Sequence, residues 1–422
     1  MKAVILAAGE GQRLRPLTYT RPKHMIPVGG RPILEHLINS LKASGIKEVL
    51  MVVNYKEDVI REYFGDGSKY GIKIDYVRQK EISGTANAIL SAKDYVNGPF
   101  LAVNGDIFVS SNAVRLLIDR AYLERADLAL VAIRVERPER FGVLKMRDWE
   151  LIEIMEKPVS DIPSNLVNAG IYLFSPKIFD YIERTEPSER GELEITESIQ
   201  LMVRENKKVL VVEIAREDWL DIGRPWDLLD ANALILNQMK PEILGDVEEG
   251  ARIKGSAYIG KDALIRAGSY IEGPVFIGEG SNIGPNCYIR PYTSIGKNVR
   301  IGNACEIKNS ILMDNVHVGH LSYLGDSIIG ENCNLGAGSI SANLRFDRKT
   351  VKMRIKGEIV DTGRVKMGVV MGDNVSTGVG VLFMPGVTIG CNCWIGPNVV
   401  VYENVPPNTI LILEQQIRRL SI

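Results

Sequence analysis

Glycines and basic residues cluster just after the first apolar run of the chain. Residues 6–16 read Leu-Ala-Ala-Gly-Glu-Gly-Gln-Arg-Leu-Arg-Pro, and residues 21–28 read Arg-Pro-Lys-His-Met-Ile-Pro-Val. Glycine lets backbone N–H groups approach an anion closely, and Arg13 adds a charge that can bridge phosphates. Two prolines flank Lys23 and stiffen its loop. Because the segment has neither a Gly-x-Gly-x-x-Gly dinucleotide motif nor a Gly-Lys-Ser/Thr Walker motif, it predicts a phosphate-binding loop of another kind.

The two stretches together resemble the signature of the sugar nucleotidyltransferases, Leu-Ala-Ala-Gly-x-Gly-x-Arg-Leu followed by Arg-Pro-Lys-x-x-x-Pro. The resemblance implies that Arg13 and Lys23 contact the triphosphate and that Asp106 and Asp221 hold a metal ion. Matching motifs along the first half imply nucleotide and sugar binding by Leu6, Ala8, Gly9, Gln79, Gly84, Thr85, Gly142, Glu156, Lys157 and Asn168.

The reaction implied by this resemblance joins a nucleoside triphosphate to a sugar 1-phosphate. A phosphate oxygen of the sugar attacks the α-phosphorus and pyrophosphate leaves in line, so the enzyme mainly positions and neutralises two polyanions. Mg²⁺ prefers carboxylate and phosphate oxygens, and Asp106 and Asp221 would supply the carboxylates. Gln79 can pair with uracil or thymine, so UTP and dTTP both stay open, as do glucose 1-phosphate and N-acetylglucosamine 1-phosphate.

Two of the four histidines lie close together in the second half, at His317 and His320. Acetyl transfer to an amine needs a group that accepts the proton of the amine, and a neutral imidazole does this near pH 7. The run Gly319-His-Leu-Ser-Tyr-Leu-Gly-Asp326 resembles the acetyltransferase domain of the bifunctional enzymes that make UDP-N-acetylglucosamine. By that resemblance His320 is the general base, Asn343 is its neighbour, and acetyl-CoA is the cosubstrate. The amino sugar phosphate would be bound by Arg290, Lys308, Tyr323, Asn334 and Lys349.

The segment after Asn343 departs from the bacterial members of that family. Leu344-Arg345-Phe346-Asp347 stands where they have a tyrosine and a shorter loop, and Val379 stands where they tend to have serine. Archaeal-type relatives share the longer loop, which favours retained acetyl transfer. The acceptor stays open between glucosamine 1-phosphate and galactosamine 1-phosphate.

The elements that must position these residues differ between the two halves. The first half alternates strand-like runs with amphipathic helical stretches, for example 3–7, 33–44, 48–54 and 57–64. This βαβα order predicts an α/β, Rossmann-like domain with a mostly parallel sheet and with ligands at the carboxyl ends of its strands. A helix over 225–239 is expected to close a nucleotidyltransferase domain of residues 1–240.

A period of six replaces this pattern in residues 241–422 and predicts a parallel β-helix. By resemblance to the hexapeptide-repeat transferases it would be left-handed. The inward positions of the predicted repeat are Ile253, Ile259, Ile265, Ile271, Ile277, Ile283, Ile289, Ile295, Ile301, Ile307 and Met313, and then Met371, Thr377, Phe383, Ile389, Ile395 and Val401. We expect the register to slip between Met313 and Ile329, around 317–325. A basic loop at about 344–366 should interrupt the coils and could reach a phosphate.

Composition limits the function classes. The 422 residues carry a net charge of −1 without long runs of one sign, which argues against nucleic acid or a membrane surface as the main partner. No secretory leader or long apolar span is apparent, so a soluble cytoplasmic protein is expected. The five cysteines are odd in number and scattered, which disfavours a disulfide framework.

Two alternatives to a bifunctional enzyme stay open. The chain could be a nucleotidyltransferase whose β-helix serves assembly or feedback control, as in the mannose-1-phosphate guanylyltransferases. It could also be a regulatory subunit like the translation-initiation exchange factors, although intact Lys23, Asp106 and Asp221 speak against this. Resemblance to hexapeptide transferases further implies a homotrimer with acetyl-CoA bound between neighbouring β-helices.

Overall fold

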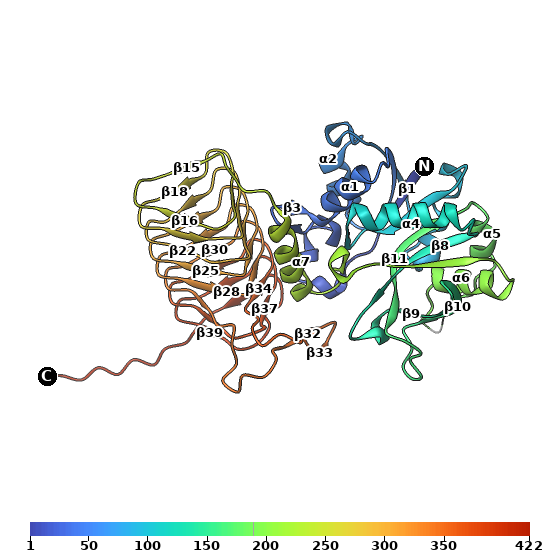
Figure 1. The fold of residues 1–422 in the computed structure, drawn as a ribbon. Helices are drawn as coiled ribbons and strands as arrows, with labels where there is room; N and C mark the ends of the chain where they lie inside the picture. Colours follow the sequence, from blue (N-terminus) through green and yellow to red (C-terminus); the bar gives the residue numbers. More distant parts are fainter. Residues whose placement is uncertain (189) are drawn as a thin grey trace. The chain divides into compact units, whose positions relative to one another are not determined.

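The computed structural model describes residues 1–188 and 190–422 and divides into two compact units (Figure 1). The first unit contains Met1–Glu10, Pro22–Met25 and Pro32–Ile222, and the second contains Gly11–Arg21, Ile26–Arg31 and Gly223–Ile422. The segment that is predicted to bind phosphate is therefore divided between the units at residues 10 and 11. Helix α7 (Pro225–Gln238) packs with the second unit, while the domain boundary at residue 240 stays a prediction.

The first unit is built on a nine-stranded sheet with the order β5-β4-β1-β6-β11-β8-β12-β10-β9. Strands β5, β4, β1 and β6 are mutually parallel, and β12 is parallel to β8. Because β11 and β10 are antiparallel to their neighbours, seven of the nine strands run in one direction, which confirms the mostly parallel sheet. The strands are β1 (Lys2–Ala7), β4 (Glu48–Val53), β5 (Lys73–Arg78), β6 (Phe100–Asn104), β8 (Leu128–Arg134), β9 (Gly142–Arg147), β10 (Glu150–Glu156), β11 (Leu166–Phe174) and β12 (Val209–Glu213).

Helices cover both faces of this sheet. Side chains alternate along β1, so Ala3 and Ile5 face one core with α1 (Ile33–Ala43), α2 (Glu57–Phe64) and α4 (Ser111–Leu123). Val4 faces the other core, with α3 (Thr85–Leu90), α5 (Ile178–Ile182) and α6 (Ile195–Arg204). Burial on both faces explains the nearly continuous apolar sequence of the central strands. None of the described helices is long and apolar enough to cross a bilayer.

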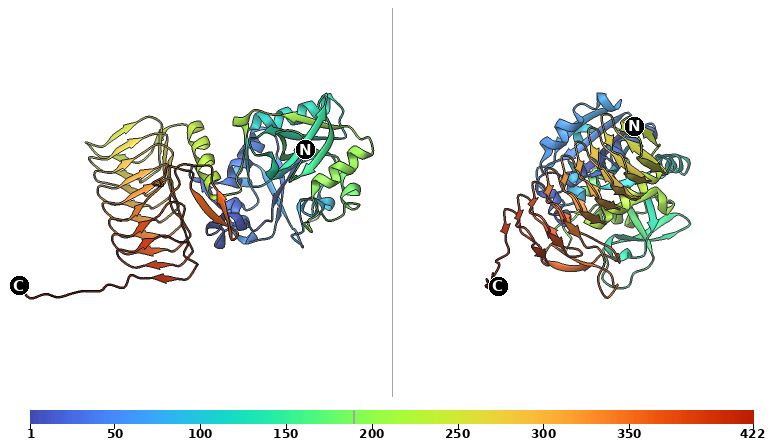
Figure 2. Two further views of the ribbon diagram at one scale, coloured as in Figure 1. Left: turned by 90° about the horizontal axis from the view of Figure 1, so that it is seen from below. Right: turned by 90° about the vertical axis from the view of Figure 1, so that its left-hand side faces the viewer.

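The second unit contains three sheets of short parallel strands that run from β14 (Glu242–Ile243) to β40 (Ile410–Leu411) (Figure 2). In most of the stack a strand pairs with the strand 18 residues later, as Ile259 does with Ile277 and Ile277 does with Ile295. Three hexapeptides therefore make one coil, and the aliphatic side chains fill a common interior. This confirms the hexapeptide β-helix, while its left hand stays a prediction.

The predicted register is wrong at two places. Leu312, not Met313, pairs with Ile295 and Ile329, so the step from Ile307 to the next inward residue is five residues long. A second five-residue step leads from Leu324 to Ile329, whereas the stretch around 317–325 keeps the regular spacing.

The short steps fall at two corners, at Asn309 and at Asp326, and both residues adopt positive φ. Both corners join the sheet that contains β25 (Glu306–Lys308) to the sheet that contains β26 (Ile311–Leu312). Met313 is also buried, so an apolar pattern alone could not separate it from Leu312.

At the same corner of the next coil, the chain leaves the coils and forms the basic loop predicted at about 344–366, which we call the charged segment. It forms an antiparallel hairpin of β32 (Lys352–Ile355) and β33 (Glu358–Asp361), and an isolated bridge joins Leu344 to Lys366. The coils resume at β34 (Val370–Met371), which pairs with β29 (Ile328–Ile329). All five cysteines are buried and free.

Candidate functional sites

The carboxyl ends of β1 and β6 bring together three of the predicted nucleotide residues. The Gly105 N–H donates to the Leu6 carbonyl (2.9 Å), which fixes the turn that presents Asp106. Lys23 forms an ion pair with Asp106, and a side chain at Gly9 would contact the Lys23 Cε at 3.8 Å. Lys23 therefore lies over the glycine loop with its charge next to a buried carboxylate.

Asp221 reaches the same edge through a small antiparallel ladder. It ends β13 (Trp219–Asp221), which pairs with β7 (Ile107–Val109) so that Asp221 lies opposite Ile107. The Ile222 N–H also donates to the Asp106 carbonyl at 3.0 Å. The fold thus places next to each other two carboxylates that are far apart in the sequence.

These two carboxylates suit a magnesium ion that takes its other ligands from phosphate and water. No group of three or more His, Cys, Asp or Glu side chains within 1–188 and 190–422 is placed to hold a metal by itself. An ion at Asp106 and Asp221 would therefore depend on the phosphates of the substrate.

His24, between Lys23 and the core, is completely buried. Burial, helped by the neighbouring Lys23 charge, lowers the pKa of its imidazole to about 3, so His24 is neutral at physiological pH. Its ring also requires Gly105, because a Cβ there would lie 2.9 Å from His24 Cδ2 and 2.8 Å from the Leu6 carbonyl oxygen.

The predicted base-binding residues lie between β5 and α3. Gln79 is buried, and its Nε2 donates to the Asn87 side chain at 2.9 Å. Gly84 has φ 118°, and a Cβ there would lie 2.4 Å from the Leu193 carbonyl oxygen, so only glycine fits. Thr85 accepts a hydrogen bond from the Ile195 N–H (3.0 Å), which ties this loop to α6.

The predicted sugar residues converge from β9, β10 and β11. A Cβ on Gly142 would lie 3.3 Å from Glu156 Oε2 and 3.6 Å from Asn168 Cβ, so these three residues surround one space. Lys157 comes directly after Glu156 and has a positive φ angle, and its Nζ lies 3.4 Å from Glu156 Oε1. Asn168 Nδ2 donates to the Tyr172 hydroxyl at 2.6 Å.

Sequence reasoning missed the groups behind Glu156. Thr196 donates to Glu156 Oε2 (3.2 Å), and Arg190 pairs with both Glu156 and Glu194. Burial and, secondly, the Glu156 charge raise the pKa of the Glu194 carboxyl to about 7. The run of acidic residues around Glu194 gave a signal, but only the fold shows that Glu194 is buried beside Glu156.

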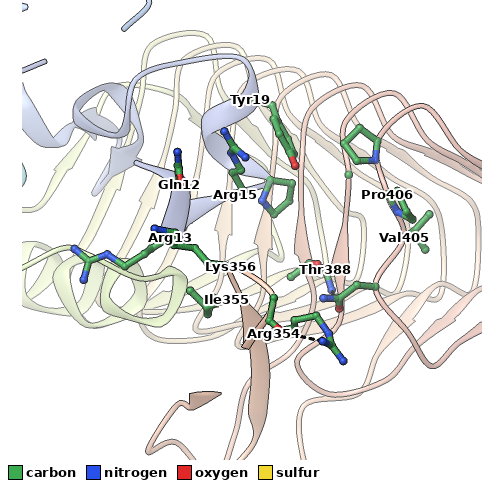
Figure 3. Close-up of a pocket in the computed structure, with 15 residues that line it drawn as sticks. Gln12, Arg13, Arg15, Tyr19, Arg354, Ile355, Lys356, Thr388, Val405 and Pro406 are labelled. Carbon is green, nitrogen blue, oxygen red and sulfur yellow. Dashed lines mark hydrogen bonds between the residues drawn. The ribbon is translucent and has the colours of Figure 1, made fainter. Parts of the chain in front are cut away.

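Arg13, the other predicted triphosphate residue, belongs to the loop that packs with the second unit. It lies in the 3₁₀ helix η1 (Gln12–Leu14), exposed at the edge of a cavity (Figure 3). Arg21 anchors the end of this loop, since its buried guanidinium pairs with Asp373 and Glu331 of the coils. These carboxylates raise the pKa of Arg21 above its ordinary value, although burial opposes them.

Four of the predicted acetyl-transfer residues lie in, or just after, neighbouring strands of one sheet of the β-helix. Arg290 follows β22 (Tyr288–Ile289), Lys308 ends β25, Tyr323 begins β28 (Tyr323–Gly325), and Asn343 follows β31 (Ile340–Ser341). Arg290 pairs with Glu306 at 2.7 Å, and Glu306 lies opposite Tyr323 in the ladder.

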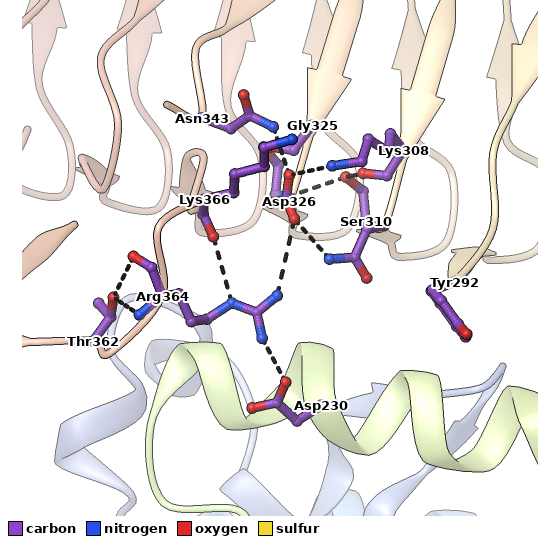
Figure 4. Close-up of polar contacts among 12 residues, drawn as sticks. Asp230, Tyr292, Lys308, Ser310, Gly325, Asp326, Asn343, Thr362, Arg364 and Lys366 are labelled. Carbon is purple, nitrogen blue, oxygen red and sulfur yellow. Dashed lines mark hydrogen bonds and ion pairs between the residues drawn. The ribbon is translucent and has the colours of Figure 1, made fainter. Parts of the chain in front are cut away.

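Asp326, which the sequence did not single out, joins this group (Figure 4). Its carboxylate accepts from Lys308 Nζ (3.1 Å), Asn309 Nδ2 (2.7 Å) and Asn343 Nδ2 (2.5 Å). Asn343 also donates to the Tyr323 hydroxyl at 3.2 Å, and Arg364 from the charged segment approaches Asp326 at 3.9 Å. Only 2% of Asp326 is exposed, so the carboxylate orients its partners instead of meeting ligand directly.

The structure does not bring His320 into this group. His320 precedes β28, whereas Asp326 follows it, so the two residues lie at opposite ends of this strand. The Asn303 N–H donates to His320 Nδ1 at 3.1 Å, which leaves the proton of a neutral ring on Nε2. As a base, His320 must therefore accept a proton at Nδ1 in place of this contact, or its ring must turn.

Two further predicted residues also lie elsewhere. Asn334 begins β30 (Asn334–Leu335) and pairs with His317 of β27 (His317–Val318) on another sheet. Lys349 is exposed in the charged segment, where its N–H donates to Asp347 Oδ1 at 3.2 Å.

Comparison with known proteins matches both halves. The nucleotidyl transferase family model covers residues 2–238, a model described as the GMPPB C-terminal domain covers residues 271–382, and a hexapeptide repeat of succinyl-transferase covers residues 366–403. The fold of a putative glucose-1-phosphate thymidylyltransferase from Bacillus anthracis is similar, with a TM-score of 0.51 and 32% identity over 56% of this chain and 94% of that chain.

Relatives of nearly full length carry names that cover both activities. The bifunctional protein GlmU of Methanocaldococcus jannaschii is 46% identical over 97% of each chain. A bifunctional sugar-1-phosphate nucleotidylyltransferase/acetyltransferase of Sulfurisphaera tokodaii is 43% identical over 96% of this chain and 98% of that protein. The predicted bifunctional enzyme is therefore confirmed over the alternatives, and the chain belongs to the family of bifunctional sugar-1-phosphate nucleotidyltransferases and acetyltransferases.

Proposed function

We propose that the first half transfers a nucleotidyl group from UTP or dTTP to N-acetylglucosamine 1-phosphate or glucose 1-phosphate. The observation that carries this proposal is the Lys23–Asp106 pair with Asp221 beside it at the carboxyl ends of the strands. Mg²⁺ held by Asp106 and Asp221 would neutralise phosphate charge in the transition state. Lys23 would exchange its contact with Asp106 for a phosphate oxygen, and Gly142, Glu156 and Asn168 would orient the sugar.

Pyrophosphate release tests this half with each pairing of the two nucleotides and two sugar phosphates. Asp106→Ala should lower kcat at least about 100-fold, because a charge-stabilising group in the transition state contributes roughly that much. Glu217→Ala removes an exposed carboxylate close to Asp221 in the chain and is the matched control. Undiminished turnover of the Asp106→Ala variant would contradict the metal assignment.

For the β-helix we propose transfer of acetyl from acetyl-CoA to glucosamine 1-phosphate or galactosamine 1-phosphate. The supporting observation is that Lys308, Tyr323 and Asn343 meet around Asp326. The amine nitrogen would bond to the thioester carbonyl carbon as the carbon–sulfur bond breaks. His320 would take the amine proton and return it to the departing thiolate.

Release of coenzyme A thiol measures this reaction with each amino sugar phosphate. His320→Ala should reduce the rate roughly 100-fold or more, since general bases contribute about that factor. His317→Ala is the control, because His317 is also an exposed histidine of the same coil. Equal rates for the wild type and the His320→Ala variant would remove His320 from the mechanism.

We further propose a homotrimer with acetyl-transfer sites between neighbouring chains. His320 and Asp326 lie at opposite ends of β28, so a site that uses both is better completed by a second chain. The neighbour of His320, Leu321, is an exposed apolar residue that suits such a contact, and Val379 is another exposed apolar residue of the β-helix. The cytoplasmic location stays a prediction.

Mixing two inactive variants tests the shared site. Chains with His320→Ala and chains with Asn343→Ala should regain thiol release when they are co-expressed, because a mixed trimer contains some sites with both wild-type residues. Light scattering would give the mass of the particle. A trimer without regained activity would indicate a site within one chain, and a monomer would overturn the assembly.

A further inference from the structure

A cavity of about 490 Å³ lies within the second compact unit, beside the loop Gly11–Arg21 (Figure 3). Its other walls come from the turn of the β32–β33 hairpin and from the last coils of the β-helix. Four lining residues are cationic, namely Arg13, Arg15, Arg354 and Lys356, and the described lining contains no aspartate or glutamate. Like charges gathered in one hollow create a strong positive potential.

The positive charge of this cavity is largely uncompensated. The side chains of Arg13 and Lys356 show no hydrogen bond or ion pair to any residue of the described chain, and both are exposed. Arg354 Nη1 donates to the Gly357 carbonyl at 2.8 Å, which is a neutral partner. Arg15 lies over the Tyr19 ring at 5.1 Å. An anion that entered the cavity would therefore meet the free charged donors of Arg13 and Lys356.

The hairpin holds its two cations in place through buried neighbours. Val351, Met353 and Ile355 are buried and fix the first strand on the coils, so the exposed residues that alternate with them face outward. Lys356 and Gly357 form the two-residue turn and both have positive φ, which is typical of tight hairpins. The turn that lines the cavity is thus part of an anchored element.

We propose that this cavity binds a diphosphate group, using Arg354 and Lys356 of the hairpin together with Arg13 and Arg15. Planar guanidinium groups pair with phosphate oxygens in a bidentate manner, and a lysine adds a point charge. The volume is that of a small-molecule site and exceeds what a single phosphate needs. The diphosphate belongs either to the nucleotide and pyrophosphate of the enzyme's own reaction or to a separate effector such as a nucleotide sugar.

Calorimetric titration of the full chain with pyrophosphate tests the proposal. Replacing both cations, as Arg354→Ala with Lys356→Ala, should weaken binding about tenfold or more, because charge-assisted contacts are lost. Lys352→Ala removes an exposed cation of the same hairpin that does not line the cavity, and it should bind as the wild type does. Lys356→Ala alone keeps the Arg354–Gly357 contact and should weaken binding by a smaller factor.

An unchanged dissociation constant in the double variant would overturn the proposal, whether or not the chain transfers nucleotides. The Michaelis constant for the nucleoside triphosphate then identifies the source of the anion. A roughly tenfold increase in the double variant would show that the reaction's own phosphates bind in the cavity. An unchanged constant together with weakened pyrophosphate binding would show that the ligand is a separate diphosphate.

Discussion

At the scale of single residues, Asp326 is the carboxylate that joins several residues of the proposed acetyl-transfer site. It accepts hydrogen bonds from Lys308, Asn309 and Asn343 while it is almost completely buried. A buried carboxylate with several donors fixes their orientation and compensates the lysine charge. Because it acts through its partners, Asp326 is a positioning residue.

Asp326→Asn should therefore impair acetyl transfer alone. The amide keeps the shape of the side chain but places a donor against one of its partners and no longer balances the charge of Lys308. We expect thiol release to fall about 10- to 100-fold, as is typical when a supporting partner is lost, while pyrophosphate release stays unchanged. Asp347→Asn changes an exposed carboxylate of the charged segment and is the control. A variant that keeps full acetyl transfer would contradict this role.

Glu194, next to the predicted sugar-binding residue Glu156, makes the folding stability depend on pH. Burial and then the charge of Glu156 raise the pKa of its carboxyl from 4.5 to about 7 in the folded chain. Between these values the folded state holds more protons than the unfolded state, so the free energy of unfolding falls as pH rises from about 4.5 to 7.

Glu194→Gln should remove this dependence. Relative to the wild type, the variant should gain stability between pH 5 and pH 8, because the amide has no ionised form to bury. Thermal unfolding midpoints at both values measure the change. Glu192→Gln, at an exposed neighbour, should show no such gain. Parallel pH profiles of the wild type and the Glu194→Gln variant would refute the raised pKa.

At the scale of elements, the loop Gly11–Arg21 depends on the β-helix coils for its position. Arg21 pairs with Asp373 and Glu331, and Thr20 donates to Asp373 at 2.6 Å. Asp373 Oδ1 also accepts from the Glu331 N–H at 2.8 Å, so one buried carboxylate joins the loop to the turn of a coil. Loop and coil therefore form one packing unit although they are distant in sequence.

Asp373→Ala should destabilise this unit by about 3–5 kcal/mol, because it leaves the Arg21 guanidinium buried without its main partner. Glu331→Ala should cost less, since the Glu331 side chain is 35% exposed and its pair is partly screened by water. Urea unfolding monitored on the second unit gives both values. Combining Arg21→Met with Asp373→Leu should recover most of the loss. Failure to recover would show that Asp373 acts mainly through its hydrogen bonds from Thr20 and from the Glu331 N–H.

At the scale of the whole molecule, the predicted residues of the two reactions belong mainly to different compact units. Lys23, Asp106 and Asp221 lie in the first unit, and His320, Asn343 and the Asp326 group lie in the second. Arg13 is the exception, because its loop packs with the second unit.

The two activities should therefore be separable by mutation. Asp106→Ala should abolish pyrophosphate release and leave thiol release within about twofold of the wild type, and Asn343→Ala should do the reverse, since sites that share no residue act independently. Both assays on each variant measure this. Loss of both activities in either variant, with an unchanged unfolding midpoint, would indicate coupling between the units.

The sequence determined the type of each half through local patterns. The βαβα order and the six-residue period each repeat many times, so single exceptions do not obscure them. Helix α2 begins at Glu57 and ends at Phe64, as predicted, because its apolar spacing is clear. The motifs around Lys23 and His320 indicate the family without any information on contacts.

Only the tertiary structure decided which distant residues meet. Asp221 reaches Asp106 through one short ladder, and Asp326 gathers Lys308 and Asn343 through two corners that are one residue shorter than the repeat. Ile311, Leu312 and Met313 are all apolar and buried, so the apolar pattern does not show which of them takes the inward position of the repeat. The cationic cavity likewise brings together residues near positions 15 and 355, a proximity set by long-range packing, which local sequence does not encode.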